Sequence, residues 1–373
     1  MVLAIISHTE HYIDSAGNIV GWGATIREVN HVASIFDKVY HVAPLYDGKA
    51  PSGMLTYEAS NVEFVPLRPS GGEQLKDKFS VLAVLPHNMA VIRQTLKKCD
   101  VFQFRAPTGM GVYVIPYLLL SGKKGWFKYA GNWGEPRPPK SYSFQRFLLR
   151  KQHNYKVTIN GRWPNQSEHL LTFENPCLTE EERMEGKQSV ANKDFSGNLD
   201  FVFIGRLEDA KGVHRILEVF SKVNNSRIGK IHLIGDGPKR EEYEEYAKNH
   251  CKQEIIFHGF LKKDEINKVL SPSHVFLLPS DSEGFPKVVA EAANFGLIPI
   301  VSDVSCIGQY VIEGETGYLI PPKDTEALEK AVCKILDLSE EKLSYISGNS
   351  FDMTSSFTFG HYKDRIKALI VDK

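Results

Sequence analysis

Charged side chains and glycines gather in four short motifs in the second half of the chain, each directly after an apolar run. The first motif contains Arg206 and Lys211, between an apolar run at 200–204 and an amphipathic segment. The free N–H groups at the start of a helix favour anions, and arginine and lysine both bind phosphate oxygens. This spacing therefore predicts an anion-binding turn between a strand and a helix. The alternative is a surface turn with two solvated cations.

The most informative motif, at 280–292, contains two glutamates separated by seven residues, Glu283 and Glu291. Pro286 suits the first position of a helix, which puts Glu283 in the loop before it and Glu291 about one and a half turns inside. The first carboxylate could hold a sugar hydroxyl and the second a ribose hydroxyl pair. The alternative is a capping acid followed by an ordinary helical glutamate.

Two weaker motifs carry glycines. Residues 234–238 read Ile-Gly-Asp-Gly-Pro, and residues 257–261 read Phe-His-Gly-Phe-Leu. Glycine lets the main chain approach a ligand closely, so the backbone around Gly259 could meet a planar base. We interpret the first of these motifs as mainly structural, and His258 as an ordinary strand-end histidine.

Apolar runs of about five residues alternate with amphipathic segments along the whole chain, which predicts parallel sheets covered by helices and an α/β fold. All four motifs then lie at the carboxyl ends of parallel strands, where doubly wound folds bind ligands. The predicted strands are 2–6, 38–42, 62–65, 101–104, 126–129, 200–204, 230–234, 254–257, 274–278 and 298–301. The predicted helices are 22–35, 86–97, 110–120, 142–152, 211–223, 239–249, 263–270, 286–295 and 325–336, with a short turn and a helix over 357–371.

The length of 373 residues suggests two domains, each with its own core. A composition of 42% hydrophobic and 24% charged residues excludes a disordered chain, a collagen-like repeat and a small disulfide scaffold. The 45 basic residues balance the 45 acidic ones, so nucleic acid is not an expected partner. The five cysteines form no C-x-x-C pair and predict neither a zinc site nor a disulfide framework.

The boundary between the two halves is expected near Asn175 and Pro176, before a polar stretch at 179–197 that we interpret as a linker or a surface excursion. The apolar N-terminus is too short for a signal peptide, and the longest later apolar run, 112–120, covers about half of a membrane span. We therefore expect a cytoplasmic protein that does not cross a membrane.

Basic charge concentrates in residues 121–162, where ten lysines and arginines interleave with aromatics against one acid, Glu135. Residues 141–151 could form an amphipathic basic helix, which can lie on an anionic membrane surface. Two interpretations stay open at this point: peripheral contact with the inner face of such a membrane, or a solvated basic face over a helix packed on the core. A third interpretation, nucleic-acid binding, is disfavoured because no recognition motif accompanies the charges.

Together, the four motifs resemble those of the retaining glycosyltransferases of family 4, the glycosyl transferases group 1. The matching order is G-R-L-x-x-x-K-G, I-G-D-G-P, F-x-G and E-G-F-P with a second glutamate eight positions after the first, over about 201–321. The resemblance implies the GT-B fold: two Rossmann-like domains with doubly wound parallel sheets, facing across a cleft, and a C-terminal helix that returns to the first domain. It implies an acceptor-binding domain at 1–178 with a crossover helix at 355–373, and a nucleotide-sugar-binding domain at 179–354.

The resemblance also implies roles for individual residues. Arg206 and Lys211 would bind the donor diphosphate, Glu283 would contact hydroxyls of the donor sugar, and Glu291 would bind the ribose. In the first half, where the match is looser, Gly23 takes the place of a glycine that closes over the donor phosphate. Arg105 stands where many members have a histidine. The remaining residues implied to lie beside the donor are Gly205, Gly259, Phe260, Leu261, Gly284, Phe285 and Pro286.

The function that this implies is transfer of a hexose from a UDP- or GDP-sugar to a hydroxyl acceptor, a lipid-linked or growing polysaccharide glycan, with retention of the anomeric configuration. Arg206, Lys211 and the helix start would stabilise the leaving diphosphate in place of a metal, so neither a metal nor another cofactor is expected. Two alternatives remain open. One is a nucleotide-sugar epimerase or hydrolase of the same fold, and the other is a non-catalytic nucleotide-sugar-binding scaffold.

Overall fold

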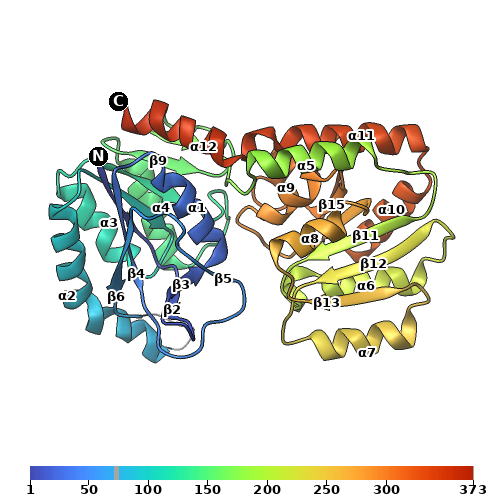
Figure 1. Cartoon of the computed structure of the whole chain (residues 1–373), viewed down its shortest axis with the longest axis horizontal. Helices are drawn as coiled ribbons and strands as arrows, with labels where there is room; N and C mark the ends of the chain where they lie inside the picture. The colour runs from blue at the N-terminus through green and yellow to red at the C-terminus, as the bar shows by residue number, and fades with distance from the viewer. Residues whose placement is uncertain (71–74, 373) are drawn as a thin grey trace. The chain divides into compact units, whose positions relative to one another are not determined.

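The computed structural model describes residues 1–70 and 75–372 (Figure 1). The chain divides into two compact units. The first unit contains Met1–Asn175 and the residues from Phe359 on, and the second unit is Pro176–Thr358. These boundaries lie within a few residues of the division drawn from the sequence.

A seven-stranded parallel sheet forms the centre of the first unit. The first strand lies inside the sheet, and later strands are added first on one side of it and then on the other. The switch point of this doubly wound order lies between β1 and β7. In spatial order the strands are β10 (Leu170–Thr172), β9 (Lys156–Ile159), β8 (Gly125–Tyr129), β7 (Val101–Ala106), β1 (Val2–Ile6), β4 (Lys38–Pro44) and β6 (Val62–Leu67).

The side chains of β1 alternate between two hydrophobic cores, one on each face of the sheet. Leu3 and Ile5 belong to one core, and Ala4 and Ile6 to the other. A parallel strand buried on both faces needs this continuous apolar sequence. Helix α1 (Gly23–Ala33) covers the first core, whereas α2 (Leu75–Lys97), α3 (Gly111–Leu120) and α4 (Lys140–Lys151) cover the second.

Helix α12 (Phe359–Ile366) returns to the first unit, as the predicted fold requires. Tyr362 and Ile366 are buried in the same core as Leu3, and α12 lies against α1. Arg365 is paired with Glu174 at 2.9 Å. The far end of the chain therefore supplies part of the apolar face that covers the first sheet.

The second unit contains a six-stranded parallel sheet with the strand order 3-2-1-4-5-6 of a Rossmann fold. The switch point lies between β11 and β14, the first and fourth strands of this unit. In spatial order the strands are β13 (Ile255–Gly259), β12 (Ile228–Ile234), β11 (Leu199–Ile204), β14 (Val275–Leu278), β15 (Ile298–Ser302) and β16 (Tyr318–Ile320).

Helices cover both faces of this second sheet (Figure 1). One layer contains α6 (Val213–Lys222), α7 (Arg240–His250) and α10 (Thr325–Leu336). The other layer contains α5 (Glu180–Ala191), α9 (Lys287–Asn294) and α11 (Glu340–Asp352). Helix α8 (Lys263–Leu270) connects β13 to β14. The GT-B organisation predicted within each half of the chain, a doubly wound parallel sheet, is thus present in both units.

The polar stretch at 179–197 is not the predicted linker, because most of it folds as α5. The Thr179 hydroxyl accepts a hydrogen bond from the Glu182 N–H, and the Glu182 carboxylate accepts one from the Thr179 N–H. This reciprocal capping box starts a helix and was visible in the sequence as Thr-x-x-Glu.

Other sequence predictions also differ from the structure. Helix α11 was not predicted at all. The helix predicted over 86–97 begins at Leu75 instead, and Pro86 lies inside it. Six short strands were missed, because three or four residues are too few to establish a period. Three of them, β9, β10 and β16, belong to the parallel sheets, and the other three form a small antiparallel sheet of β2 (His11–Ile13), β3 (Ile19–Trp22) and β5 (Met54–Thr56).

In the part of the chain that the structure describes, no helix has both the length and the apolar character needed to cross a bilayer. Within residues 1–70 and 75–372, no three histidine, cysteine or acidic side chains gather in a way that could hold a metal ion.

Candidate functional site

The loops that follow β11 and β14 meet at the switch point of the second sheet. Gly212, at the start of α6, has a φ of 77°, and a side chain there would collide with the carbonyl oxygen of Pro279. The N–H of Asp281 donates to the carbonyl of Ala210 at 2.9 Å. The two backbones are therefore in direct contact at the carboxyl edge of the sheet, where doubly wound folds bind ligands.

Lys211 and Glu283 form an ion pair across these two loops. Lys211 Nζ lies 2.6 Å from Glu283 Oε1, and the two side chains are 27% and 11% exposed. The sequence analysis placed one in a phosphate-binding turn and the other in a sugar-binding motif. The fold brings the two motifs into contact although 72 positions separate the residues in the chain.

Arg206 lies on the same loop as Lys211 and is largely exposed. Its Nε is 3.3 Å from the Glu208 carboxylate, and 66% of the arginine side chain is accessible. An exposed ion pair of this kind contributes little to stability, so the guanidinium can leave Glu208 for another anion at low cost.

The glycines of three sequence motifs form one continuous edge of main chain. Gly205 follows β11, and its N–H donates to the carbonyl of Ile234, the last residue of β12, at 3.0 Å. Gly235 follows β12, and its N–H donates to the carbonyl of Gly259 at 2.8 Å. Three strand ends therefore present adjacent backbone to the same side of the site.

The end of β13 carries the residues predicted to meet the base. Gly259 has a φ of 68°, and a side chain there would press against the Arg240 guanidinium. Phe260 is 51% exposed, whereas Leu261 packs against the core of the second unit. An exposed aromatic ring beside a turn of main chain is a surface on which a planar ring can stack.

The loop with Gly284 and Phe285 leads into α9, and Pro286 is the residue that caps this helix. Pro286 therefore precedes the helix by one residue instead of opening it. The Phe285 ring stacks on Phe357 with 5.0 Å between centroids, and the Ser305 hydroxyl donates to the carbonyl of Gly284. The helix thus starts from an anchored loop, and its first N–H groups lack acceptors within the helix itself.

Glu291 lies inside α9 and faces a lysine from another element. Its Oε1 is 2.8 Å from Lys263 Nζ at the start of α8, and both side chains are mostly buried. Each glutamate of the fourth motif thus has a lysine partner, Lys211 for Glu283 and Lys263 for Glu291. The sequence analysis missed Lys263, since no spacing rule links it to Glu291.

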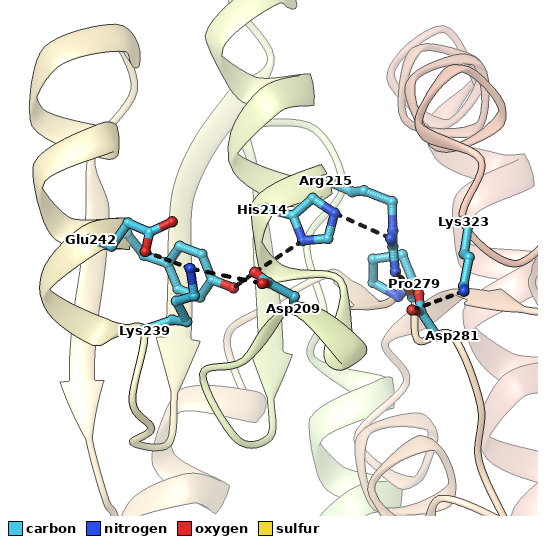
Figure 2. Close-up of polar contacts among 9 residues, drawn as sticks. Asp209, His214, Arg215, Lys239, Glu242, Pro279, Asp281 and Lys323 are labelled. Atoms are coloured by element: carbon cyan, nitrogen blue, oxygen red, sulfur yellow. Dashed lines mark hydrogen bonds and ion pairs between the residues drawn. The ribbon is translucent and has the colours of Figure 1, made fainter.

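Arg215 is a second residue that the sequence analysis missed. Only 6% of its side chain is exposed. Its Nη2 donates to the carbonyl of Pro279 at 2.6 Å and to the Asp281 carboxylate at 2.5 Å, and its Nη1 lies 3.2 Å from His214 Nε2 (Figure 2). A charged residue among the buried positions of the amphipathic α6 was the signal that could have found it.

Further polar contacts extend from Arg215 along this edge (Figure 2). Asp281 Oδ2 is 3.6 Å from Lys323 Nζ. Asp209 accepts a hydrogen bond from the Tyr243 hydroxyl at 2.8 Å and lies 3.8 Å from Lys239 Nζ. Asp209, Lys239 and Lys323 are exposed, so these contacts orient the loops more than they stabilise the fold.

Gly23, the predicted donor contact of the first half, is the first residue of α1 in the first unit. It follows β3 directly, and its N–H donates to the carbonyl of Gly53 at 3.2 Å. Gly23 therefore lies at a strand-to-helix turn, and its contact with a donor stays a prediction.

Arg105 belongs to a buried charge cluster of the first unit. Its two Nη atoms donate to the two carboxylate oxygens of Glu28 at 3.1 and 3.3 Å. Lys128 Nζ donates to the same carboxylate at 2.6 Å, and the Tyr362 hydroxyl donates at 3.3 Å. Glu28 is 1% exposed and faces two cations, so the three charged groups together leave one positive charge beside the end of β7.

A second buried polar cluster follows β1, and it includes His11 and His41. Ser7 Oγ is 2.8 Å from His41 Nε2, and the Tyr57 hydroxyl lies 2.6 Å from His41 Nδ1 and 2.8 Å from His11 Nε2. His11 Nδ1 is 2.8 Å from the carbonyl of Thr9, and the Thr9 N–H donates to Ser7 Oγ at 3.2 Å. The five residues close a ring of hydrogen bonds.

The direction of this ring follows from the carbonyl of Thr9, which can only accept. His11 Nδ1 must donate to it, so the neutral His11 ring accepts from Tyr57. Tyr57 then accepts from His41 Nδ1, and His41 Nε2 accepts from Ser7. Desolvation lowers the pKa of His11 to about 4 and lowers that of His41 well below its usual range, with smaller contributions at His41 from His11 and Arg105. Both imidazoles are therefore neutral at pH 7, as the ring requires.

The second unit matches a known family of enzymes. Residues 185–350 fit the family described as Glycosyl transferases group 1. They belong to this family. A glycogen synthase from Mycobacterium tuberculosis is 30% identical over 149 residues, which are 39% of this chain and 36% of that protein. The putative colanic acid biosynthesis glycosyltransferase WcaL from Salmonella typhimurium is 28% identical over 157 residues, 40% of this chain and 38% of that protein. The chain spans less than two-fifths of the length of these curated relatives.

Solved structures resemble this chain over its whole length. The sucrose-phosphate synthase of Thermosynechococcus elongatus superimposes with a TM-score of 0.75 at 16% identity, covering 100% of this chain and 98% of that one. Anabaena HepE, solved with UDP and glucose, gives a TM-score of 0.71 at 15% identity with both chains fully covered. The fold is therefore GT-B, as predicted from the sequence.

Proposed function

We propose that the chain is a glycosyltransferase that moves a sugar from a nucleoside-diphosphate sugar to a hydroxyl acceptor with retention of the anomeric configuration. The observation that carries this proposal is the contact between Lys211 and Glu283 at the switch point of the group 1 glycosyltransferase domain. A cation suited to phosphate and a carboxylate suited to sugar hydroxyls lie 2.6 Å apart, which matches the junction between the diphosphate and the sugar of such a donor.

In this proposal, Arg206 and Lys211 bind the diphosphate together with the first N–H groups of α9. The bond from the anomeric carbon to the phosphate oxygen breaks, and a bond to the acceptor oxygen forms on the same face. The acceptor proton passes to the departing phosphate oxygen. Fixed donors aimed at the developing charge stabilise such a transition state, so we expect no metal requirement.

The nucleoside end of the donor would lie along the glycine edge. Glu291 is assigned to the ribose hydroxyls, and the backbone at Gly205 and Gly259 with Phe260 and Leu261 to the base. HepE was solved with UDP, with UDP and glucose, and with UDP-glucose, and this supports a UDP-sugar as the donor over the GDP-sugar alternative.

The acceptor would be a glycan, and the first unit would bind it. Glycogen synthase and the colanic acid glycosyltransferase WcaL are both named for polysaccharides, which supports a growing or lipid-linked glycan as the acceptor. Gly23, at the turn before α1, is assigned to the donor phosphate in the same proposal.

A lipid-linked acceptor would bring the first unit to a membrane, and the outer face of α4 suits that contact. Gln145 and Leu149 are buried on the inner side of this helix. Phe144 and Phe147 are 41% and 56% exposed on the opposite side. Three basic residues share this outer face and no acid does: Lys140, Arg150 and Lys151. We propose that this face meets an anionic membrane surface.

This proposal assigns the membrane contact to the outer face of α4 alone and not to the whole basic segment 121–162. Lys128 is buried against Glu28, and Arg146 donates to the carbonyls of Trp133 and Glu135. Both cations therefore stabilise the first unit itself. The outer face of α4 differs from a merely solvated basic face because it exposes two phenylalanine rings among its charges.

The test of the proposed function is thermal unfolding with UDP, GDP, ADP and their common sugar derivatives, all in EDTA. A nucleotide at about 100 times its Kd stabilises the folded chain by about 2.7 kcal/mol, which is a readable shift in Tm. We expect UDP and a UDP-sugar to raise the Tm without metal. No shift with any nucleotide would contradict the proposal.

Product analysis then separates the proposed function from its alternatives. A retaining transferase attaches the sugar to an added glycan acceptor. The new linkage then has the same α or β configuration as the donor. Sugar released to water alone would indicate a hydrolase, and an isomerised nucleotide sugar would indicate an epimerase. Nucleotide binding with no turnover on any acceptor would indicate a scaffold.

A further inference from the structure

We propose that Arg215 is a positioning residue that holds Glu283 against the phosphate-binding turn, an inference that rests on the proposed function. Arg215 lies in the first turn of α6, directly after the loop with Lys211. Its guanidinium reaches across to the loop that carries Glu283 (Figure 2). It acts through that loop and has no assigned contact with the donor.

The contacts of Arg215 lie four and two positions before Glu283, the residue that they would position. Pro279 and Asp281, which accept hydrogen bonds from Nη2, precede Glu283 in the same loop. The N–H of Asp281 also donates to the carbonyl of Ala210, the residue before Lys211. Arg215 therefore ties α6 to the loop two residues before Glu283, at the same residue whose backbone joins that loop to Ala210.

The chemistry of the site requires an arginine. One planar guanidinium bonds a carbonyl and a carboxylate and also faces His214 Nε2, whereas a lysine ammonium has no such fork. The arginine is 6% exposed, and a buried cation is tolerated only when paired, which Asp281 provides at 2.5 Å. Asp281 keeps a second partner in Lys323. Loss of Arg215 would therefore release the loop without leaving this carboxylate alone.

The readout is the difference between two affinities measured by calorimetry, with UDP and UDP-glucose as probes. UDP reports the nucleotide and phosphate contacts, and UDP-glucose adds the sugar contact of Glu283. For Arg215→Met we expect UDP affinity within about threefold of wild type and UDP-glucose affinity about tenfold weaker, the scale of one hydrogen bond to a charged group. The UDP-glucose affinity of Arg215→Lys should lie between those of wild type and Arg215→Met.

A double-mutant cycle separates positioning from a general structural role. If Arg215 acts through Glu283, then Arg215→Met added to Glu283→Gln should weaken UDP-glucose no further than Glu283→Gln alone. If Arg215 had only a general structural role, the loss of UDP-glucose affinity from Arg215→Met would add in full to the loss from Glu283→Gln. The affinity for UDP would then fall by the same factor as the affinity for UDP-glucose. Asp281→Asn loosens the same contact from the other side. It should give the same selective loss, and it replaces Arg215→Met if that variant does not fold.

The outcomes distinguish this inference from the proposed function. A wild-type chain that binds none of UDP, GDP and ADP, and none of their sugar derivatives, overturns the proposed function and this inference with it. If only the guanine pair or only the adenine pair binds, the same cycle is run with that nucleoside diphosphate and its sugar derivative. A wild type that binds, combined with unchanged affinity ratios in Arg215→Met and Asp281→Asn or with full additivity, overturns the role of Arg215 alone.

Discussion

Lys211 Nζ lies 2.6 Å from Glu283 Oε1, so the loops after β11 and β14 exchange a direct ion pair at the switch point of the second sheet. A phosphate that attracts Lys211 must compete with Glu283, and a sugar hydroxyl that donates to Glu283 must compete with Lys211. We therefore expect phosphate and sugar recognition to be coupled through this pair. A phosphate that binds Lys211 frees Glu283 for the sugar, and a sugar hydroxyl that binds Glu283 frees Lys211 for the phosphate.

Removing either proposed phosphate cation should slow transfer strongly and leave folding unchanged. For Arg206→Ala or Lys211→Met we expect kcat/KM to fall by roughly 10²–10³, the loss typical of one fixed donor to a developing charge. The measurement is steady-state release of the nucleoside diphosphate, with Tm recorded beside it. Lys222→Met is the matched control, because Lys222 is exposed on α6 and pairs with Glu218. A near-wild-type rate in both site variants would refute the assignment.

Glu291→Gln should weaken binding of the nucleotide itself. The loss of charge-assisted hydrogen bonds to ribose hydroxyls predicts a Kd for UDP about tenfold to a hundredfold higher, on the scale of about 1.5–3 kcal/mol. Calorimetry with UDP measures this directly. Glu326→Gln, an exposed substitution on α10, should leave the Kd unchanged. Equal affinities in Glu291→Gln and wild type would place the ribose elsewhere.

The hydrogen-bond ring of His11, His41 and Tyr57 should make the first unit sensitive to acid. The folded-state pKa of His11, at about 4, lies below the value of about 6.5 for an unfolded histidine. The unfolded chain therefore binds more protons below pH 6.5. The contribution of His11 to the free energy of unfolding is therefore complete above about pH 6.5. It falls by about 3 kcal/mol as the pH drops toward 4.

Urea unfolding at pH 7 and pH 5 checks this prediction. His11→Gln removes the titrating group, so the unfolding free energy of this variant should depend less on pH than that of wild type. His87→Gln is the control, because His87 is exposed on α2. If wild type and His11→Gln respond to pH identically, the ring does not control acid stability.

Glu28→Gln should destabilise the first unit more than a typical substitution. The change leaves Arg105 and Lys128 buried without their shared carboxylate, and breaking a buried pair in this way costs about 3–5 kcal/mol. Glu63→Gln removes an exposed partner of Lys38 in the same unit and should cost less than about 1 kcal/mol. Chemical denaturation of the two variants gives the comparison, and similar losses would contradict a stabilising role for the buried cluster.

The outer face of α4 should bind anionic vesicles. We expect co-sedimentation with phosphatidylglycerol vesicles and little with phosphatidylcholine, weakened by 0.5 M NaCl because salt screens the basic residues. The double variant Phe144→Ser with Phe147→Ser should lose this binding. Met184→Ser with Tyr345→Ser is the matched control, since both side chains are exposed in the second unit. Binding that persists in the phenylalanine variant would exclude this face.

The alternation of strands and helices made most of this fold predictable. A parallel strand buried on both faces shows as a short apolar run, and the residues after it fall at one edge of the sheet. The meeting of Lys211 with Glu283 follows from that order. Helix α5 shows the limit of hydrophobic patterning, because its polar sequence hides a helix that only the Thr179–Glu182 capping box reveals.

The residues that orient the site were not predictable in the same way. Arg215 and Lys263 reach partners from other elements, and side-chain reach across loops has no fixed spacing in a sequence. The buried carboxylate of Glu28 looked like one more polar position on a helix, since its partners Arg105 and Lys128 lie far along the chain.

The return of α12 to the first unit has a consequence for synthesis on the ribosome. Tyr362 and Ile366 complete the core around β1, and Arg365 closes the pair with Glu174. A nascent chain that has emerged only as far as Asn175 holds every strand of the first sheet but lacks this cover. The second unit, whose residues are contiguous, can fold while the first still waits for its last helix. The unit that is translated first is therefore the one that is completed last.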